Sequence, residues 1–463
     1  MARCSAATRT VIRPRGIFVV DRWYHRSQNQ IGVSKTAISN LRPNPLKFAN
    51  VSRALFIAVA VVSVNSGWAQ TPIPVRELSA PTAKSAGTFG SILGVREIAN
   101  GKLLVNDARR RQLSVVDAKL ANKSVVIDSV TVGRQGYGRY AAPIIPYLGD
   151  STLFVDAEAL SLVVLDQNGA ATRVFAAPKP RDLYSMAYQA SGSDAKGNLL
   201  YLGQGEMVAT KNGADQPDSQ PVVRANFETR TVDTLGRVLR RITSRDSTDK
   251  VGDEYVYTIF RHPLPTFDGW APLSDGTIAI VRGRDYHVDF VRPDGSRFSG
   301  PKMPFDWKRL TDADKQALID STRAVREKRE KDPNAMPTMV SAASLQAAAN
   351  GGPPVTRANQ PKQIEREVEP REIPDYYPPL RTEAVKADGD GNIWILPSTS
   401  AQSKNGELVY DVVNNRGILT HRVRMPLERS IAGFGKGGVV YLMYRDPDPK
   451  IGWTIERTKV QNQ

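Results

Sequence analysis

Six short segments of the sequence could recognise a small molecule, because five of them hold an aromatic ring and most hold a charged side chain beside it. Aromatic rings supply apolar contact, and a guanidinium group pairs with a carboxylate through two parallel hydrogen bonds. The side chains that we expect to bind a ligand are Tyr137, Arg139, Arg181, Asp182, Tyr184, Phe267, Asp268, Tyr377, Arg381 and Arg429. Four arginines stand against two aspartates in this set, which favours an anionic ligand.

The histidines beyond the N-terminal segment are His262, His287 and His421, and no two have the spacing of a metal site. In the alternating stretch RDYHVDF, His287 and Asp289 share one face of a strand, which favours a structural role. The sequence has neither the G-x-S-x-G elbow of a serine hydrolase nor the G-x-x-x-x-G-K-[ST] loop of a nucleotide-binding protein. The pattern therefore assigns no catalytic residue and no metal ligand.

The stretch DGDGN at 388–392 is similar to the start of a calcium-binding loop. Such a loop needs Gly at its sixth position and a bidentate Glu at its twelfth, where this sequence has Ile393 and Thr399. We therefore expect a turn here and no cofactor, because no motif supports calcium.

The elements that must position these residues follow from a repeat of about 47 residues, interrupted only by insertions. In each unit a turn of Gly, Asp or Asn is followed at once by an apolar run, which is typical of a hairpin. The six turns lie at Asn100, Gly149, Lys196, Ser274, Asp388 and Lys436. Since one such unit cannot cover both of its faces, the repeat predicts an all-β fold, a six-bladed β-propeller.

The turn Asp390-Gly391-Asn392-Ile393 best shows the D-G-N-hydrophobic pattern, which resembles that of the NHL-like six-bladed propellers of bacterial secreted proteins. The resemblance covers residues 88–460 and implies the fold, but it says little about function. We expect ring closure to pair strands from both ends of the chain, with Ile73–Leu78 as the N-terminal contributor.

Aspartates ten residues apart recur, as Asp107 with Asp117 and as Asp156 with Asp166, and we interpret them as turn formers. In a propeller, the residues just before the innermost strand of each blade line one mouth of the central channel. The six segments with rings and charges (87–91, 134–143, 179–186, 263–270, 374–383 and 425–430) hold that position, so we expect a ligand at the mouth. The alternative is that the rings fill the funnel and Arg–Asp pairs join neighbouring blades.

Two insertions interrupt the period, at 205–252 and at 301–380. The second contains a helix over 310–332 that Thr311 caps and Asp314 completes as a capping box. We expect its apolar stripe to consist of Ala317, Leu318, Ser321, Ala324 and Val325.

The net charge of +16 is concentrated in residues 1–69, where Asp21 is the only acid. Elsewhere basic and acidic residues alternate, so we expect no nucleic-acid partner. Arg53, the apolar run Ala54–Val64 and small residues up to Ala69 predict a signal peptide at 51–69, since 11 apolar residues are too short to span a bilayer.

We expect residues 1–50 to be an unstructured, misassigned extension and the propeller to occupy 75–463. The alternatives are a long basic region before the signal or a membrane anchor. Cys4, the single cysteine, lies in the extension, so we expect no disulfide in the exported chain.

These observations predict an exported bacterial protein, periplasmic or extracellular, without a membrane span in its mature chain. The missing catalytic motifs favour a protein that binds a small anionic ligand, a peptide or an envelope protein at the channel mouth. The alternative is an enzyme, a metal-assisted hydrolase or lyase similar to a lactonase, with acids such as Asp182 and Asp268 on the axis.

Overall fold

The computed structural model describes residues 72–129, 136–138, 143–156, 158–179, 182–183, 186, 191–203, 208–210, 213–215, 218–242, 244–251, 254–331, 363–402, 407–448 and 452–461. The chain divides into two compact units, 1–69 and 70–463, and the described residues belong to the second. The extension expected at 1–50 and the signal peptide expected at 51–69 lie outside the described residues.

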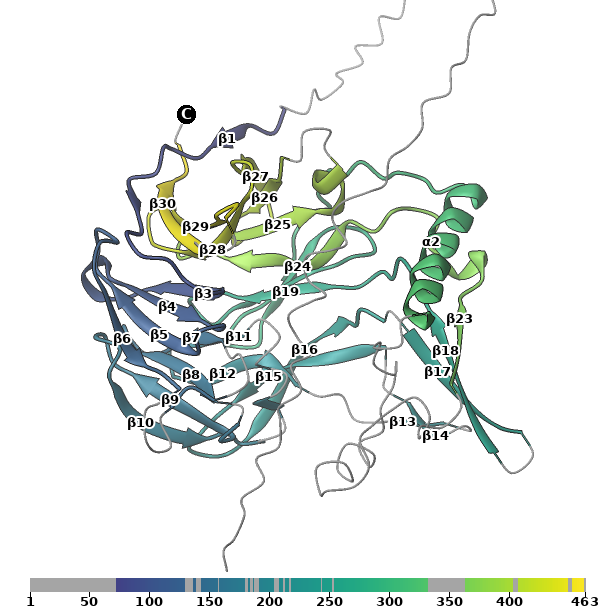
Figure 1. Ribbon diagram of the computed structural model, residues 1–463, viewed down its shortest axis with the longest axis horizontal. Helices are drawn as coiled ribbons and strands as arrows, with labels where there is room; N and C mark the ends of the chain where they lie inside the picture. The colour runs from purple at the N-terminus through teal and green to yellow at the C-terminus, as the bar shows by residue number, and fades with distance from the viewer. Residues whose placement is uncertain are drawn as a thin grey trace, which may run out of the picture. The chain divides into compact units, whose positions relative to one another are not determined.

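Six antiparallel sheets follow one another along the described chain, and each is one blade of a β-propeller (Figure 1). Blade one contains β3 (Ile92–Glu97), β4 (Leu103–Asp107), β5 (Gln112–Val116) and β6 (Lys123–Ile127). Blade two contains β7 (Ile144–Pro146), β8 (Thr152–Asp156), β9 (Ser161–Leu165) and β10 (Ala171–Ala176). Blade three contains β11 (Ser191–Ser193), β12 (Leu199–Leu202), β15 (Ser219–Ala225) and β16 (Val232–Leu239).

The remaining blades have the same order, with the innermost strand first. Blade four contains β19 (Gly269–Pro272), β20 (Ile278–Val281), β21 (Val288–Val291) and β22 (Arg297–Ser299). Blade five contains β24 (Leu380–Ala387), β25 (Ile393–Pro397), β26 (Val409–Val413) and β27 (Leu419–Arg424). Blade six contains β28 (Arg429–Phe434), β29 (Val439–Arg445) and β30 (Trp453–Lys459). The six-bladed propeller expected from the sequence is confirmed.

The N-terminal segment completes the ring. The short strand β2 (Ala83–Lys84) pairs with β30 and is the fourth strand of blade six. The strand β1 (Val75–Glu77) adds to the outer edge of blade five, parallel to β27, and Leu78 bridges Val460. Ring closure by strands from both ends of the chain is confirmed, but β2 completes blade six, whereas the expected segment Ile73–Leu78 contributes β1 to blade five. Two strand edges that would otherwise be bare are covered.

All six predicted turns lie between the first and second strands of their blades. Gly276 and Gly391 have φ angles of 85° and 83°, in the left-handed region where glycine carries no steric penalty. The carboxylate of Asp388 accepts backbone N–H bonds from Asp390 and Asn392 at 2.9 and 2.8 Å. The DGDGN stretch thus forms a blade turn that its own aspartate stabilises.

The recurring aspartate pairs form turns in the same way. Asp117 accepts from the backbone N–H of Ala121 at 2.8 Å, and Asp166 accepts from that of Asn168 at 2.8 Å. Asp156 accepts from the N–H of Ala159 at 3.0 Å. Local hydrogen bonding therefore explains this repeat without any catalytic role.

The core consists of apolar layers between neighbouring blades. Between blades three and four, for example, Leu200 and Val222 pack with Trp270 and Ile280. Fully burying a side chain of this size contributes about 1.5–3 kcal/mol, and residues 70–463 contain no cysteine with which to form a disulfide. Packing between blades is therefore the main source of stability.

The insertion expected at 205–252 is smaller than predicted, because 219–239 form β15 and β16, the two outer strands of blade three. The connection before them holds a separate two-stranded sheet, β13 (Val208–Thr210) with β14 (Gly213–Asp215). The sequence did not reveal the β15–β16 hairpin, because its polar turn within 226–231 lies in a stretch of basic and acidic residues.

The two insertions meet in one accessory module, which the sequence did not predict. The hairpin β17 (Ser244–Val251) and β18 (Glu254–Arg261) precedes blade four, and β23 (Gln363–Glu367) precedes blade five and pairs parallel with β18. The helix α2 (Asp312–Glu330) lies along β23, and the short helix η4 (Pro370–Glu372) follows β23 (Figure 1).

The capping box of Thr311 and Asp314 is present as predicted, but the predicted apolar stripe of α2 is wrong. The helix buries Lys315 and Ile319, whereas the side chain of Val325 is 56% exposed. The reason is the partner strand: β23 presents Glu365 and Glu367, which the arginines of α2 bind. Among the described residues, no helix combines the length and apolar character needed to cross a bilayer.

Candidate functional site

The expected ligand-binding residues divide into two groups. Arg139, Arg181 and Tyr184 lie outside the described residues. The others lie just before, or at the start of, the innermost strands of blades two to six. We call this side of the ring the mouth side. These residues are Tyr137, Asp182, Phe267, Asp268, Tyr377, Arg381 and Arg429.

Tyr137 and Asp182 are interior cross-links. Tyr137 is 1% exposed, and its hydroxyl donates to Oδ1 of Asn106 at 2.7 Å. Asp182 is 3% exposed and accepts a hydrogen bond from the hydroxyl of Tyr201 at 2.9 Å. Burial and then the charge of Asp182 raise the pKa of Tyr201, which therefore stays a neutral donor.

Arg429, Tyr377 and Arg381 have different surroundings from one another. The Nε atom of Arg429 donates to Glu456 at 2.9 Å, and this bond raises the pKa of Arg429. Tyr377 packs against the core of the accessory module, where burial raises its pKa. Arg381 is half-buried on β24. Ligand binding by these side chains stays a prediction.

Asp268 lies in a groove between blades three and four, on the mouth side. One wall is β16, and the other is formed by the β20–β21 turn and β22. The groove has a volume of about 830 Å³. Its charged lining consists of Arg237, Arg282, Arg284, Arg297, Asp268 and Asp285. Phe267, next to Asp268, points instead into the apolar layer between blades four and five.

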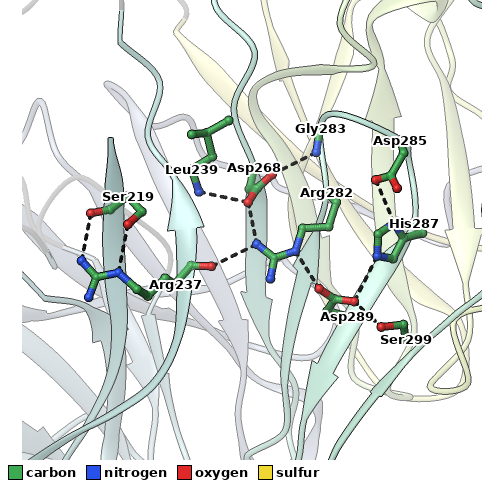
Figure 2. Close-up of polar contacts among 10 residues, drawn as sticks. All are labelled: Ser219, Arg237, Leu239, Asp268, Arg282, Gly283, Asp285, His287, Asp289 and Ser299. Atoms are coloured by element: carbon green, nitrogen blue, oxygen red, sulfur yellow. Dashed lines mark hydrogen bonds and ion pairs between the residues drawn. The ribbon is translucent and has the colours of Figure 1, made fainter. Parts of the chain in front are cut away.

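Asp268 joins the two walls of this groove (Figure 2). Its carboxylate accepts the backbone N–H of Leu239 on blade three at 3.0 Å and that of Gly283 on blade four at 3.0 Å. It also accepts from Nη1 of Arg282 at 2.7 Å, and Nε of Arg282 donates to Asp289 at 2.7 Å. Nη1 of Arg282 donates further to the carbonyl of Arg237 at 3.0 Å.

Blade one has an acid with a similar but more local role. Asp107, at the end of β4, accepts the backbone N–H groups of Gly90 and Ser91 at 2.7 and 3.0 Å. These donors belong to the mouth-side segment of the same blade. In blade four the acid is Asp268, which lies on the mouth-side segment itself. It also accepts the backbone N–H of Leu239, which belongs to the neighbouring blade three. The Asp268 network therefore holds two blades together.

His287 lies between two carboxylates at one end of the groove (Figure 2). Its Nδ1 is 2.9 Å from Asp285 and its Nε2 is 3.0 Å from Asp289. The shared face expected for His287 and Asp289 is thus confirmed, while Tyr286, Val288 and Phe290 are buried on the other face. Asp285 also pairs with Lys302 at 3.5 Å.

The charges in this network are stable near neutral pH. Burial alone would lower the pKa of Arg282, but hydrogen bonds from Arg282 to Asp289 and Asp268 outweigh it and raise that pKa. Burial alone would raise the pKa of Asp289, but hydrogen bonds from Ser299 and Arg282 outweigh it and lower that pKa. Arg282 therefore stays a cation and Asp289 stays an anion near neutral pH.

Three other arginines of the groove have no ion-pair partner among the described residues. Nε of Arg237 donates to the hydroxyl of Ser219 at 2.9 Å, and Nη2 of Arg297 donates to the carbonyl of Leu235 at 2.7 Å. Arg284 is exposed, and within the described chain its side chain has no hydrogen bond or ion pair. Neutral oxygens satisfy donors but leave the positive charge uncompensated, so these arginines could bind an anion.

The sequence indicated Asp268 but not its partners. The stretch VRGRDYHVDF carries the signal, because Arg282, Arg284 and His287 follow directly after the apolar run 278–281, at the end of a buried strand where side chains reach solvent. What it could not show is that β16 of another blade forms the opposite wall.

Asp182 and Asp268, which a metal-assisted enzyme was expected to use, have separate partners in Tyr201 and Arg282. In the part of the chain that the structure describes, no three His, Cys, Asp or Glu side chains are grouped so as to hold a metal ion.

No protein-family model and no curated protein match the chain. Among solved structures, it is similar to a virginiamycin B lyase from Staphylococcus aureus with quinupristin, at 10% identity over 81% of this chain and 97% of that one, with a TM-score of 0.35. It is also similar to regucalcin, a calcium-binding protein from Agrobacterium tumefaciens, at 13% identity over 84% and 97% of the two chains, with a TM-score of 0.35. At this level of similarity, the six sheets of this chain themselves carry the assignment of the propeller fold.

Proposed function

We propose that this protein binds a small anionic ligand in the groove between blades three and four. The observation that carries the proposal is the set of three arginines, Arg237, Arg284 and Arg297, that line one groove without an ion-pair partner among the described residues. The proposal keeps the anionic ligand expected from the sequence and moves its site from the central channel to the groove at Asp268.

The Asp268–Arg282–Asp289 network supports this proposal as a scaffold. A binding site is effective when its walls are held in place before the ligand arrives, because less ordering is then needed on binding. Asp268 bonds to both walls, and Arg282 is held by two carboxylates at 2.7 Å. The remaining arginines extend from this fixed frame into the groove.

Calorimetric titration of the purified protein tests the proposal, with succinate and with inorganic phosphate as the ligands at low salt. We expect binding of at least one anion, weakened by about tenfold or more in Arg284→Gln, because a charge-assisted hydrogen bond contributes about 1.5–3 kcal/mol.

The matched control is Arg416→Gln in the β26–β27 turn of blade five, which removes one exposed arginine elsewhere. If Arg416→Gln weakens binding as much as Arg284→Gln does, the effect is general electrostatics and the groove is not the site.

We also propose that the chain is exported, on the basis of Arg53, the apolar run Ala54–Val64 and Ala69. N-terminal sequencing of the protein recovered from its native host is expected to find a mature chain that begins near Gln70. A chain that begins before residue 60 would exclude cleavage at this position.

A further inference from the structure

The three arginines without ion pairs come from three different elements of the groove. Arg237 is on β16, Arg284 is in the β20–β21 turn, and Arg297 is the first residue of β22. Arg237 and Arg297 each donate to an uncharged oxygen, which fixes part of the guanidinium group without neutralising it. The uncompensated positive charge is therefore spread along the groove.

The middle of the groove has the opposite character. Arg282 lies there between Asp268 and Asp289, with both carboxylates at 2.7 Å. A ligand carboxylate placed at Arg282 would have to approach two fixed negative charges, which is unfavourable. Anionic groups of a ligand are therefore directed away from the middle and toward Arg237 and Arg284. Asp285, which follows Arg284, is already paired with Lys302 at 3.5 Å.

Arg237 and Arg284 line opposite walls of the groove, Arg237 on blade three and Arg284 on blade four. Figure 2 shows Arg237 with Ser219 at one end, the Asp268–Arg282 pair in the middle, and Asp285 with His287 at the other end. Arg284 directly precedes Asp285 in the β20–β21 turn and lines the groove on blade four. A ligand with an anionic group at each end can therefore meet one arginine from each blade.

The size of the groove agrees with a longer ligand. A volume of about 830 Å³ is near the upper part of the range for sites that hold small organic molecules. Inorganic phosphate would fill only a small part of it, whereas a short chain with an anionic group at each end would extend from one wall to the other.

Resting on the proposed function, we propose that the ligand is a dicarboxylate that spans the groove, with one carboxylate on Arg284 and the other on Arg237. Its uncharged linker lies over the Asp268–Arg282 pair. Arg297 adds positive charge to the β16 side.

Calorimetric titration with straight-chain dicarboxylates from malonate to adipate, and with acetate and inorganic phosphate, tests this proposal at one pH and low salt. We expect one or two chain lengths to bind at least tenfold more tightly than acetate or phosphate, since the second carboxylate adds a charge-assisted contact. Arg237→Gln and Arg284→Gln are each expected to reduce that affinity to the level of acetate, while Arg416→Gln leaves it unchanged.

Three outcomes would overturn the proposal, and they separate it from the function on which it rests. If acetate binds as tightly as every dicarboxylate, the groove binds anions but does not select two carboxylates. If phosphate binds most tightly, a single compact anion is preferred and the dicarboxylate is wrong. If none of the probes binds, the proposed anion site fails together with this inference.

Discussion

Replacing Asp268 with Asn is expected to destabilise the propeller, because this carboxylate joins blade three to blade four. The side chain of Asp268 is 6% exposed and accepts from Leu239 N, Gly283 N and Arg282 Nη1 at 3.0, 3.0 and 2.7 Å. Breaking a buried charge pair costs about 3–5 kcal/mol. Arg282 is 30% exposed and keeps Asp289, so we reduce this figure to about 2–3 kcal/mol.

Urea unfolding of the wild type and the variant, followed by tryptophan fluorescence, measures this loss of unfolding free energy. Asp233→Asn on β16 is the matched control, because Asp233 is 61% exposed and 3.6 Å from Arg224. We expect the control to lose less than about 1 kcal/mol, as is usual for exposed pairs. Equal losses in the two variants would refute the view that Asp268 holds the two blades together.

Three further results are expected. Glu367→Ala removes the carboxylate that binds Arg326 at 2.8 Å, so hydrogen exchange should become faster throughout α2; unchanged exchange would show that apolar contacts hold the helix alone. Burial and then the charge of Arg76 lower the pKa of His421 to about 4. As pH drops from about 6.5 to 4, the unfolded chain binds this proton before the folded chain does, so the unfolding free energy falls. A His421→Gln variant whose unfolding free energy has the same slope against pH would contradict this. Deleting residues 72–84 removes β1 and β2 and leaves the edges of β27 and β30 bare, so gel filtration should show aggregation, and a monomer with an unchanged circular dichroism spectrum would be the contrary result.

The blades could be predicted from the sequence because their signals are local. Each first turn is made by a glycine or an Asx residue within a few positions, and the strand that follows is apolar and β-branched. Asp388 illustrates this, since its carboxylate bonds to the backbone only two and four residues further on. Such turns need no information from distant parts of the chain.

The accessory module could not be predicted because its contacts are not local. Arg261 on β18 and Glu365 on β23 are 104 positions apart and are joined at 3.0 Å. The pairing of these strands is parallel, so no tight turn marks it in the sequence. For the same reason the sequence of α2 alone predicts the wrong buried face, because the arginines of α2 face β23 only where Glu365 and Glu367 are present to bind them.

The groove depends both on local signals and on contacts between distant residues. For this reason only one of its residues, Asp268, could be predicted from the sequence as a ligand-binding residue. Asp268 was recognisable because it follows an aromatic ring just before an innermost strand. Its function as a link depends on Leu239, the last residue of β16, which a long insertion separates from it in the sequence. Asp107 shows the alternative, in which the acid bonds within its own blade. Because Asp268 bonds to both blades, it joins the two walls of the groove that Arg237 and Arg284 line.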